Sequence, residues 1–529
     1  MKVTNYLITA LLGLTLLITG CSKSQNTNSP KTLYTNIGGE PTILNPILST
    51  DVPSSEITGL VFNGLFRVDI NMSIVPDLVS TYSVSEDGRI YTFKLHQNIK
   101  WHDGKPFTAE DVQFTFDKIL DLKTNTVRRS NLIVAGKPVQ FKVVDAYTLT
   151  ATLAEPDAPF LSNISIGILP KHILQNQDIN IATFNRQPIG TGPFKFQKWE
   201  TGQYITLTKN LNYYKEGPKL DRIVAKIIPD TNTALVALEK QEIDSGKIPY
   251  KDLEKYQNNT KINVFEFEDL MYTYMAFNLK NPKFKDIKVR QAIAHAIDKK
   301  SMTDKILKGH GRPAHIPAAP VSWSYPNNPT FPIFEYNPTQ SAKLLDEAGW
   351  KLNPTTKIRE KNGQKLSFTL ITNQGNQDRE RSAQIIQQYL AAVGIQMNIQ
   401  LMEWSSFVKR INEPRDPKNF DAVMLGWALG IDPDSTSIWH SSEYPKGFNF
   451  IAYNNPKVDA LLDQGRKTID QFQRKAVYNK LYTQIASDVP YVFLYYPNVI
   501  TGINKRVKGL SPAGPTGLFN PIENITIEP

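Results

Sequence analysis

The sequence predicts a mixed α/β fold, and one region carries this prediction most clearly. Residues 366–372 (LSFTLIT) alternate like a half-buried strand, and residues 395–401 alternate in the same way. Residues 381–393 lie between them, and Gly394 follows as a plausible helix C-cap. A strand, a helix and a second strand of these lengths predict a right-handed parallel unit. The apolar residues at helical spacing are Ala383, Ile386, Leu390 and Val393.

Segments on both sides of this unit fit the same fold class. Alternating or β-branched runs bounded by turn residues predict strands, and one of them follows the Asp87-Gly88 turn. Longer stretches with apolar residues on one face predict helices. These further elements are strands at 31–37, 91–95 and 421–428, helices at 456–465 and 470–488, and a buried strand or return segment at 490–496.

The first thirty residues predict export. Lys2 gives a positive start, and residues 6–19 form an apolar run of about fourteen residues, whereas a bilayer span needs roughly twenty. Cys21 is the only cysteine in 529 residues, which excludes a disulfide within the chain. Residues 22–31 are polar and contain a proline, as in a flexible tether. No second segment of membrane length follows, so we expect a protein that does not span the membrane.

The charge pattern gives little support to nucleic-acid binding. The formal charge is +10, but basic and acidic residues are interspersed, and no Lys/Arg run with interleaved aromatic residues occurs. We therefore expect an ordinary soluble surface with a basic excess and no nucleic-acid partner.

Residues 99–120 (IKWHDGKPFTAEDVQFTFDKIL) contain two pairs, His102-Asp103 and Glu110-Asp111, that look catalytic in isolation. Asp103-Gly104 is, however, a turn signal, and Thr108 is well placed to cap a helix with Asp111 three residues later. We interpret this segment as a turn followed by a helix, with no acid/base role for His102.

Residues 424–441 (MLGWALGIDPDSTSIWHS) bring carboxylates, serines and a histidine together just after an expected strand. They could form an acid/base site, a metal site or a ligand-capture loop. Ligands of open α/β sheets gather at the carboxyl ends of strands, which favours ligand capture. Enzyme motifs are weak: Ser406 and Lys409 fit S-x-x-K without its companion motifs, and His310 and His315 share a loop without a third ligand. We predict no catalytic residues, no metal site and no cofactor.

Several motifs, taken together, resemble family 5 of the bacterial solute-binding proteins, the peptide, nickel and related receptors of ABC importers. Residues 99–120 resemble the W-x-D-G-x-P-[FL]-T-A-x-D-V stretch of that family. Other motifs match in the order in which they occur along family members, although Asn45 stands where the family usually has an aspartate. They are Gly39-Glu40-Pro41, Leu44-Asn45-Pro46, residues 190–194 (GTGPF), 212–214 (NYY), 219–223 (KLDRI), Asn278, 289–292 (VRQA) and 296–298 (AID). The sequence Ile18-Thr19-Gly20-Cys21 resembles a lipobox, in which the cysteine is diacylated.

The resemblance implies a periplasmic-binding-protein-like class II fold, with two hinged lobes and three domains. The expected division is a signal peptide at 1–20, a lipid-anchored tether at 21–31, domain I at 32–65, 190–280 and 495–529, domain II at 66–189, and domain III at 281–494. It also implies a non-enzymatic monomer anchored through Cys21 to the outer or periplasmic side of the cell membrane. This monomer would pass oligopeptides to the transmembrane subunits of an ABC permease.

Alternatives remain open at this point. Within the family, the ligand could be nickel or a nickel chelate, and sugars and opines are also family ligands. Outside the family, the chain could be a cell-surface peptidase or an adhesion lipoprotein.

The resemblance also implies which residues bind a peptide. Aromatic candidates are Tyr272, Tyr274, Phe277, Trp404 and Trp427, for which core packing is the competing role. Di- and oligopeptide receptors hold the ligand ammonium with an aspartate three residues after this tryptophan, where the present chain has Gly430. Asp432 can reach the ammonium if the loop shifts, and Asp434 can instead cap a helix. For the ligand carboxylate, the candidates are Arg381, placed at the head of the 381–393 helix, and its competitor Arg379.

Overall fold

The computed structural model describes residues 30–328 and 330–528, and residues from Lys31 onward form one compact unit. The expected signal peptide, Cys21 and most of the tether lie outside the described residues. Within them, helices and strands alternate as the mixed α/β prediction requires.

A single large sheet runs through the described chain, and its longest strand is β23 (Tyr491–Asn504). Two further strands, β14 (Ile262–Glu268) and β16 (Gly311–Pro313), pair with β23 beside the main path. The order along that path is β10 (Phe194–Glu200), β11 (Tyr204–Lys209), β12 (Arg222–Lys226), β1 (Thr32–Asn36), β13 (Ser245–Lys247), β23, β15 (Met271–Phe277), β22 (Ala422–Ala428), β20 (Ser367–Asn373) and β21 (Gln396–Met402).

The predicted strand–helix–strand unit is confirmed. Strands β20 and β21 pair in parallel, and α11 (Gln377–Ala392) connects them. Gly394 follows this helix with φ +84°, a conformation that suits glycine. The predicted helix start at residue 381 was wrong by four residues, because the side chain of Asn376 caps the helix by accepting from the Arg379 N–H at 3.0 Å. The polar first turn carries no apolar periodicity that could have revealed this start.

The other expected elements are also present. Strands β1, β22 and β23 confirm three of the predicted strands, and α14 (Pro456–Lys467) and α15 (Gln471–Asp488) confirm the two long helices. A separate antiparallel sheet has the order β4-β5-β9-β8. Its strands are β4 (Val79–Val84), β5 (Ile90–Leu95), β8 (Gln140–Asp145) and β9 (Thr148–Thr152), and α2 (Ala109–Leu120) contacts β8.

The turn and helix after Trp101 have the structural role that the sequence predicted. The Thr108 N–H donates to the Asp111 carboxylate at 3.0 Å and completes a capping box at the start of α2. His102 accepts from the Gly190 N–H at 3.2 Å, and its Nε2 lies 3.0 Å from the Gly192 oxygen. Burial lowers the pKa of His102 to about 4, so the ring is a neutral structural group.

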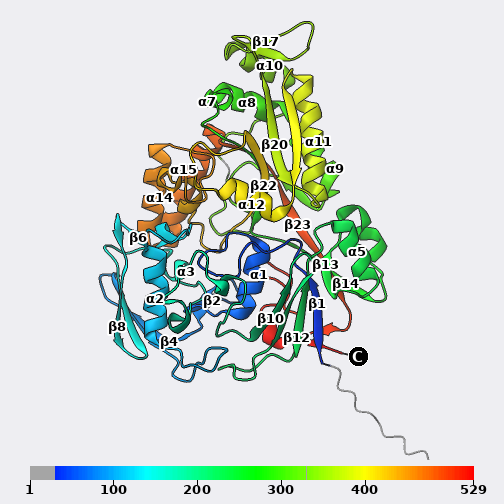
Figure 1. The fold of residues 1–529 in the computed structure, drawn as a ribbon. Helices are drawn as coiled ribbons and strands as arrows, with labels where there is room; N and C mark the ends of the chain where they lie inside the picture. Colours follow the sequence, from blue (N-terminus) through cyan, green and yellow to red (C-terminus); the bar gives the residue numbers. More distant parts are fainter. Residues whose placement is uncertain (1–29, 329, 529) are drawn as a thin grey trace, which may run out of the picture. The chain divides into compact units, whose positions relative to one another are not determined.

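Three hydrophobic cores lie along the large sheet. The first takes residues between 33 and 227 together with residues between 503 and 525, and the other two take residues between 235 and 500. In the latter part, α8 (Ile287–Ala296), α9 (Lys299–Leu307) and α11 pack on one face, and α12 (Trp404–Asn412), α14 and α15 pack on the other (Figure 1). Strand β23 contributes Ile503 to the first core, Val492 to the second and Phe493 to the third, so this strand joins them.

The remaining elements are short connections and surface additions. The helices are α1 (Val52–Val61), α3 (Phe160–Asn163), α4 (Lys171–Leu174), α5 (Thr231–Glu239), α6 (Leu253–Tyr256), α7 (Pro282–Lys285), α10 (Pro338–Glu347) and α13 (Thr436–Trp439). The strands are β2 (Phe66–Val68), β3 (Ile74–Pro76), β6 (Ile133–Val134), β7 (Lys137–Pro138), β17 (Lys351–Leu352), β18 (Arg359–Lys361), β19 (Gln364–Lys365), β24 (Val507–Lys508) and β25 (Thr526–Ile527).

A buried lysine at the start of α9 makes the stability of the fold depend on pH. Lys299 is 8% exposed, its Nζ donates to the Ala314 oxygen at 3.0 Å, and burial lowers its pKa to about 7. The unfolded chain therefore binds one more proton than the folded chain between about pH 7 and 10. The free energy of unfolding should rise across this range by up to about 1.4 kcal/mol per pH unit from this residue alone.

Urea unfolding at pH 7, 8 and 9 measures this effect. Lys299→Met should flatten the rise of the unfolding free energy with pH. The Lys300 side chain is 81% exposed, so Lys300→Met should leave that rise unchanged. The same slope in wild type and Lys299→Met would contradict this account of Lys299.

Candidate functional site: the loop after strand β22 and its surroundings

The residues after β22 form a short loop that is held by its own carboxylates. The Asp434 N–H donates to Asp432 Oδ1 at 2.9 Å. Asp434 Oδ1 in turn accepts from the N–H and the hydroxyl of Thr436, at 3.1 and 2.6 Å. The N-cap residue of α13 is Ser435, so Asp434 lies one position before the cap, and its carboxylate fixes the loop to Thr436, the first residue of the helix.

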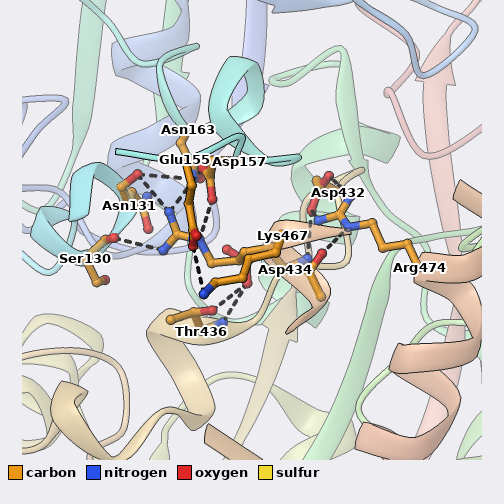
Figure 2. Close-up of polar contacts among 12 residues, drawn as sticks. Ser130, Asn131, Glu155, Asp157, Asn163, Asp432, Asp434, Thr436, Lys467 and Arg474 are labelled. Carbon is orange, nitrogen blue, oxygen red and sulfur yellow. Dashed lines mark hydrogen bonds and ion pairs between the residues drawn. The ribbon is translucent and has the colours of Figure 1, made fainter. Parts of the chain in front are cut away.

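Asp432 is engaged by an arginine of the same half of the molecule. Arg474 on α15 donates to both carboxylate oxygens, at 2.6 and 2.7 Å, and the two side chains are 5% and 16% exposed. Burial disfavours the cation, but the hydrogen bonds and charge of Asp432 outweigh it and raise the pKa of Arg474 above its ordinary value. In this structure the carboxylate of Asp432 therefore anchors the loop to α15 (Figure 2).

Trp427 and Gly430 lie at the end of β22 beside a cavity of about 160 Å³. Leu270, Asp432 and Tyr482 also line this cavity. A Cβ atom added to Gly430 would meet nothing nearer than the Asp432 carbonyl oxygen at 3.6 Å. Space alone therefore does not require glycine here.

The two predicted tyrosines lie behind Trp427 in the third core. Tyr272 and Tyr274 are both 0% exposed. The Tyr274 ring stacks on Tyr491, with centroids 4.2 Å apart, and lies nearly parallel to Trp427 at 6.2 Å. This burial supports core packing for both tyrosines, and a direct ligand contact by either stays a prediction. Phe277 is 0% exposed in the second core.

Trp404 faces the other half of the molecule. It is the first residue of α12, and its ring carbons lie 3.2 Å from the position that a Cβ on Gly39 would occupy. Asn412, at the end of the same helix, donates to the Thr50 hydroxyl at 3.0 Å. These contacts place α12 against the chain segment that leads into α1.

The two candidate arginines of α11 lie in different environments. Arg381 is exposed, and because α11 begins at Gln377, it lies in the second turn rather than at the head of the helix. The Arg379 guanidinium lies 3.8 Å from the position of a Cβ on Gly426 of β22. Its Nε is buried and has no hydrogen-bond partner among the described residues, and burial lowers its pKa. Arg379 is therefore the arginine that lies against β22.

An ion pair that sequence reasoning missed joins the two halves. Arg466 on α14 meets Asp157 at 2.8 and 3.1 Å, and the two side chains are 9% and 2% exposed (Figure 2 shows Asp157 with the neighbouring Ser130 and Asn131). Arg466 also donates to the Ser130 oxygen at 3.0 Å, and its own carbonyl accepts from the Ala158 N–H at 2.8 Å. We call the Asp157–Arg466 pair the clasp. Its partners are 309 residues apart, and no local signal could have revealed it.

Both residues of the clasp stay charged, although burial disfavours the charged form of each. Burial raises the pKa of Asp157 to about 6 against the opposing effect of Arg466, so Asp157 is still mainly ionised at neutral pH. Burial alone would lower the pKa of Arg466, but Asp434 and Asp157 outweigh it and raise that pKa above its ordinary value. A second ion pair nearby, Lys467–Glu155 at 2.9 Å, is more exposed.

The clasp borders a cavity of about 920 Å³ between the two halves. Thr126 and Ser130 line it from one half, and His440 and Lys446 line it from the other. Glu443 lines it as well, and burial raises the pKa of Glu443 to about 7.

Residues 30–328 and 330–528 were compared with the side-chain groups that bind metal ions and with the helices that cross membranes. No group of three or more His, Cys, Asp or Glu residues within 30–328 and 330–528 is arranged to hold a metal ion. In the same part of the chain, no helix combines the length and hydropathy that a membrane crossing needs.

Comparison with known proteins decides the family. Residues 73–449 match the family described as bacterial extracellular solute-binding proteins, family 5. The chain belongs to this family. It is 38% identical to the oligopeptide-binding protein AppA of Bacillus subtilis over 97% of both chains. The resemblance inferred from the motifs is thereby confirmed.

Solved structures of the family support the class II fold. The structure of Bacillus subtilis AppA in complex with a nonapeptide has a TM-score of 0.90 and 36% identity, over 94% of this chain and 100% of that chain. NikZ from Campylobacter jejuni, in complex with Ni(L-His), has a TM-score of 0.84 and 30% identity, over 94% and 99%. The predicted fold class, a periplasmic-binding-protein-like class II arrangement of two lobes, is confirmed.

Proposed function

We propose that the chain is the substrate-binding component of an ABC importer and that it captures oligopeptides between its two halves. The observation that carries this proposal is the similarity to AppA, which extends over 97% of both chains. The environment of β22 supports it, because an extended peptide can bind through main-chain hydrogen bonds near a strand end without a fixed side-chain sequence. The cavity of about 920 Å³ offers further room for a long ligand.

Closure of the two halves would bury the ligand and form the Asp157–Arg466 ion pair of the clasp. In this proposal the ligand favours the closed state because it contacts both halves only in that state. The domain division inferred from the motifs belongs to this proposal, with domain I at 32–65, 190–280 and 495–529, domain II at 66–189, and domain III at 281–494. Domain III would move against the other two through the strands that cross between the halves.

The cellular setting is also part of the proposal. Cys21 would be diacylated after removal of residues 1–20 and would anchor a non-enzymatic monomer to the outer or periplasmic face of the cell membrane. From there the protein would deliver peptides to the transmembrane subunits of the permease.

Arg379 is the residue that we expect to hold the carboxylate of a ligand. Its buried Nε lacks a partner among the described residues, and guanidinium groups bind carboxylates with strong, charge-assisted hydrogen bonds. Arg379→Gln should weaken binding of a nonapeptide with a free carboxylate by about 10- to 100-fold. The affinity for its C-terminal amide should change little, as measured by isothermal titration calorimetry.

The neighbouring Arg381→Gln variant is the matched control, because Arg381 is exposed and should not affect either peptide. Equal losses for the free and amidated peptides in Arg379→Gln would contradict the carboxylate role. Failure of the wild-type protein to bind any peptide would contradict the proposed function itself.

A nickel chelate is the second candidate ligand. The similarity to NikZ in complex with Ni(L-His) favours it, since a chelate brings its own metal ligands and does not need a protein cluster. Titration with nickel and histidine under the same conditions distinguishes the two candidates, because binding of the chelate without binding of peptides would establish the second.

A further inference from the structure

A buried carboxylate at the contact between the two halves has no counter-charge. Glu443 ends the short helix Ser441–Glu443, which follows α13, and it lines the cavity of about 920 Å³ that Ser130 lines from the other half. Glu443 is 8% exposed, and no cationic side chain within residues 30–328 and 330–528 forms an ion pair with its carboxylate. In this it differs from Asp157 and Asp432, each of which meets an arginine.

Both halves enclose this carboxylate. In its own loop, the Gly447 N–H donates to the Glu443 main-chain oxygen at 2.5 Å, and a Cβ atom on Gly447 would overlap the carboxylate. On the other side, α13 packs against the short helix Arg129–Leu132 of the first half. The Ser130 hydroxyl of that helix acts on Glu443 as a hydrogen-bond donor and has no other partner in the described part of the chain. Separation of the halves would therefore expose the carboxylate to water.

The charged groups that face Glu443 from the first half do not neutralise it. Arg129, Glu155 and Asp157 line the same cavity. The two acidic residues already have their ion-pair partners on α14. The Arg129 guanidinium donates to main-chain oxygens. Contact with the first half therefore removes Glu443 from water without bringing it an unpaired cation from the described residues.

The groups of its own half give Glu443 little further compensation. His440, Lys446 and Asp463 line the cavity as well. The His440 Nδ1 atom lies 2.7 Å from a serine hydroxyl oxygen of the same loop, and Lys446 and Asp463 are exposed. Asp434 adds a negative charge nearby. A proton on the carboxyl group would remove the need for a counter-charge.

The pKa of Glu443 agrees with this geometry. Burial is the largest effect and raises the pKa to about 7, and Asp434 acts in the same direction, whereas the Ser130 hydroxyl and Arg466 oppose both. In an open state, water would return the pKa toward its ordinary value of 4.5. The contact between the halves would then bind one proton more than the open state between about pH 4.5 and 7. Above about pH 8 both states are ionised, and this difference disappears.

We propose that Glu443 makes closure sensitive to pH: its carboxylate takes up a proton when the two halves meet around a ligand and releases it when they separate. This inference rests on the proposed function and adds a regulation to it, because peptide capture is then favoured in acidic surroundings.

Calorimetric titration of the full-length protein in two buffers of different ionisation enthalpy tests this assignment, since it counts the protons that accompany binding. At pH 7 the wild-type protein should take up about 0.5 proton more per bound nonapeptide than Glu443→Gln, whose amide cannot ionise. The wild-type Kd should also be lower at pH 6 than at pH 8, by a ratio about tenfold larger than that of Glu443→Gln. The comparison between variants cancels the protons of the peptide itself.

Asp463→Asn is the matched control, because Asp463 lines the same cavity but is exposed, and it should keep the wild-type proton count and Kd ratio. If Glu443→Gln did not fold, the wild-type proton count would still decide. A wild-type count near zero at pH 7, or equal counts in wild type and Glu443→Gln, would overturn the assignment alone. A wild-type protein that bound no peptide at any pH would overturn the proposed function as well.

Discussion

Replacing Arg466 with alanine should weaken peptide binding by about 100-fold, equivalent to about 3 kcal/mol. While the two halves are in contact as they are in this structure, the variant would leave the Asp157 carboxylate buried and unpaired, because its side chain is only 2% exposed. In an open state, Asp157 would regain water and the variant would lose little. The loss should therefore appear as faster ligand dissociation, measured by stopped-flow fluorescence, with a smaller change in the association rate.

Two controls separate the clasp from a general loss of charge. Lys467→Ala removes the more exposed pair with Glu155, whose side chains are 53% and 31% exposed, and should change the affinity by less than tenfold. The double variant Asp157→Ala/Arg466→Ala should bind more tightly than Arg466→Ala alone, because it leaves no buried charge unpaired. Equal affinity losses in Arg466→Ala and Lys467→Ala would contradict the role of the clasp.

Replacing Arg474 with alanine should lower the free energy of unfolding by about 3 kcal/mol. The change would leave Asp432, which is 16% exposed, without the two hydrogen bonds that it accepts from Arg474. It would also remove the Arg474 bond to the Gly465 oxygen. Chemical unfolding measures the loss, and Arg474→Ala combined with Asp432→Asn should recover part of it.

The same ion pair predicts how Asp432 itself behaves. Asp432→Ala should weaken binding of free and N-acetylated peptides alike, because its carboxylate anchors the loop in this structure. A selective loss for free-amine peptides would instead support the ammonium contact that the sequence left open for Asp432.

The fold could be predicted from the sequence wherever a pattern is local. The alternation of residues 366–372 and the spacing of Ala383, Ile386 and Leu390 were sufficient for the parallel unit, because strand and helix periods differ. The start of α11 was not predictable from that pattern, since its first turn is polar and depends on the Asn376 cap.

The site was predictable only in part, for a physical reason. The segment after Trp427 could be recognised as the end of a strand, because β22 and its loop are contiguous in the chain. The clasp and the pairing of Asp432 with Arg474 join residues 309 and 42 positions apart.

The central claim is that this family member encloses peptides between its two halves. Native mass spectrometry of the full-length protein, purified without denaturation, tests it most directly. The account predicts about one peptide per protein, with mixed sequences that become detectable when the complex is dissociated. Stoichiometric nickel without peptide, or a protein that carries no ligand and retains none from a peptide library, would contradict it.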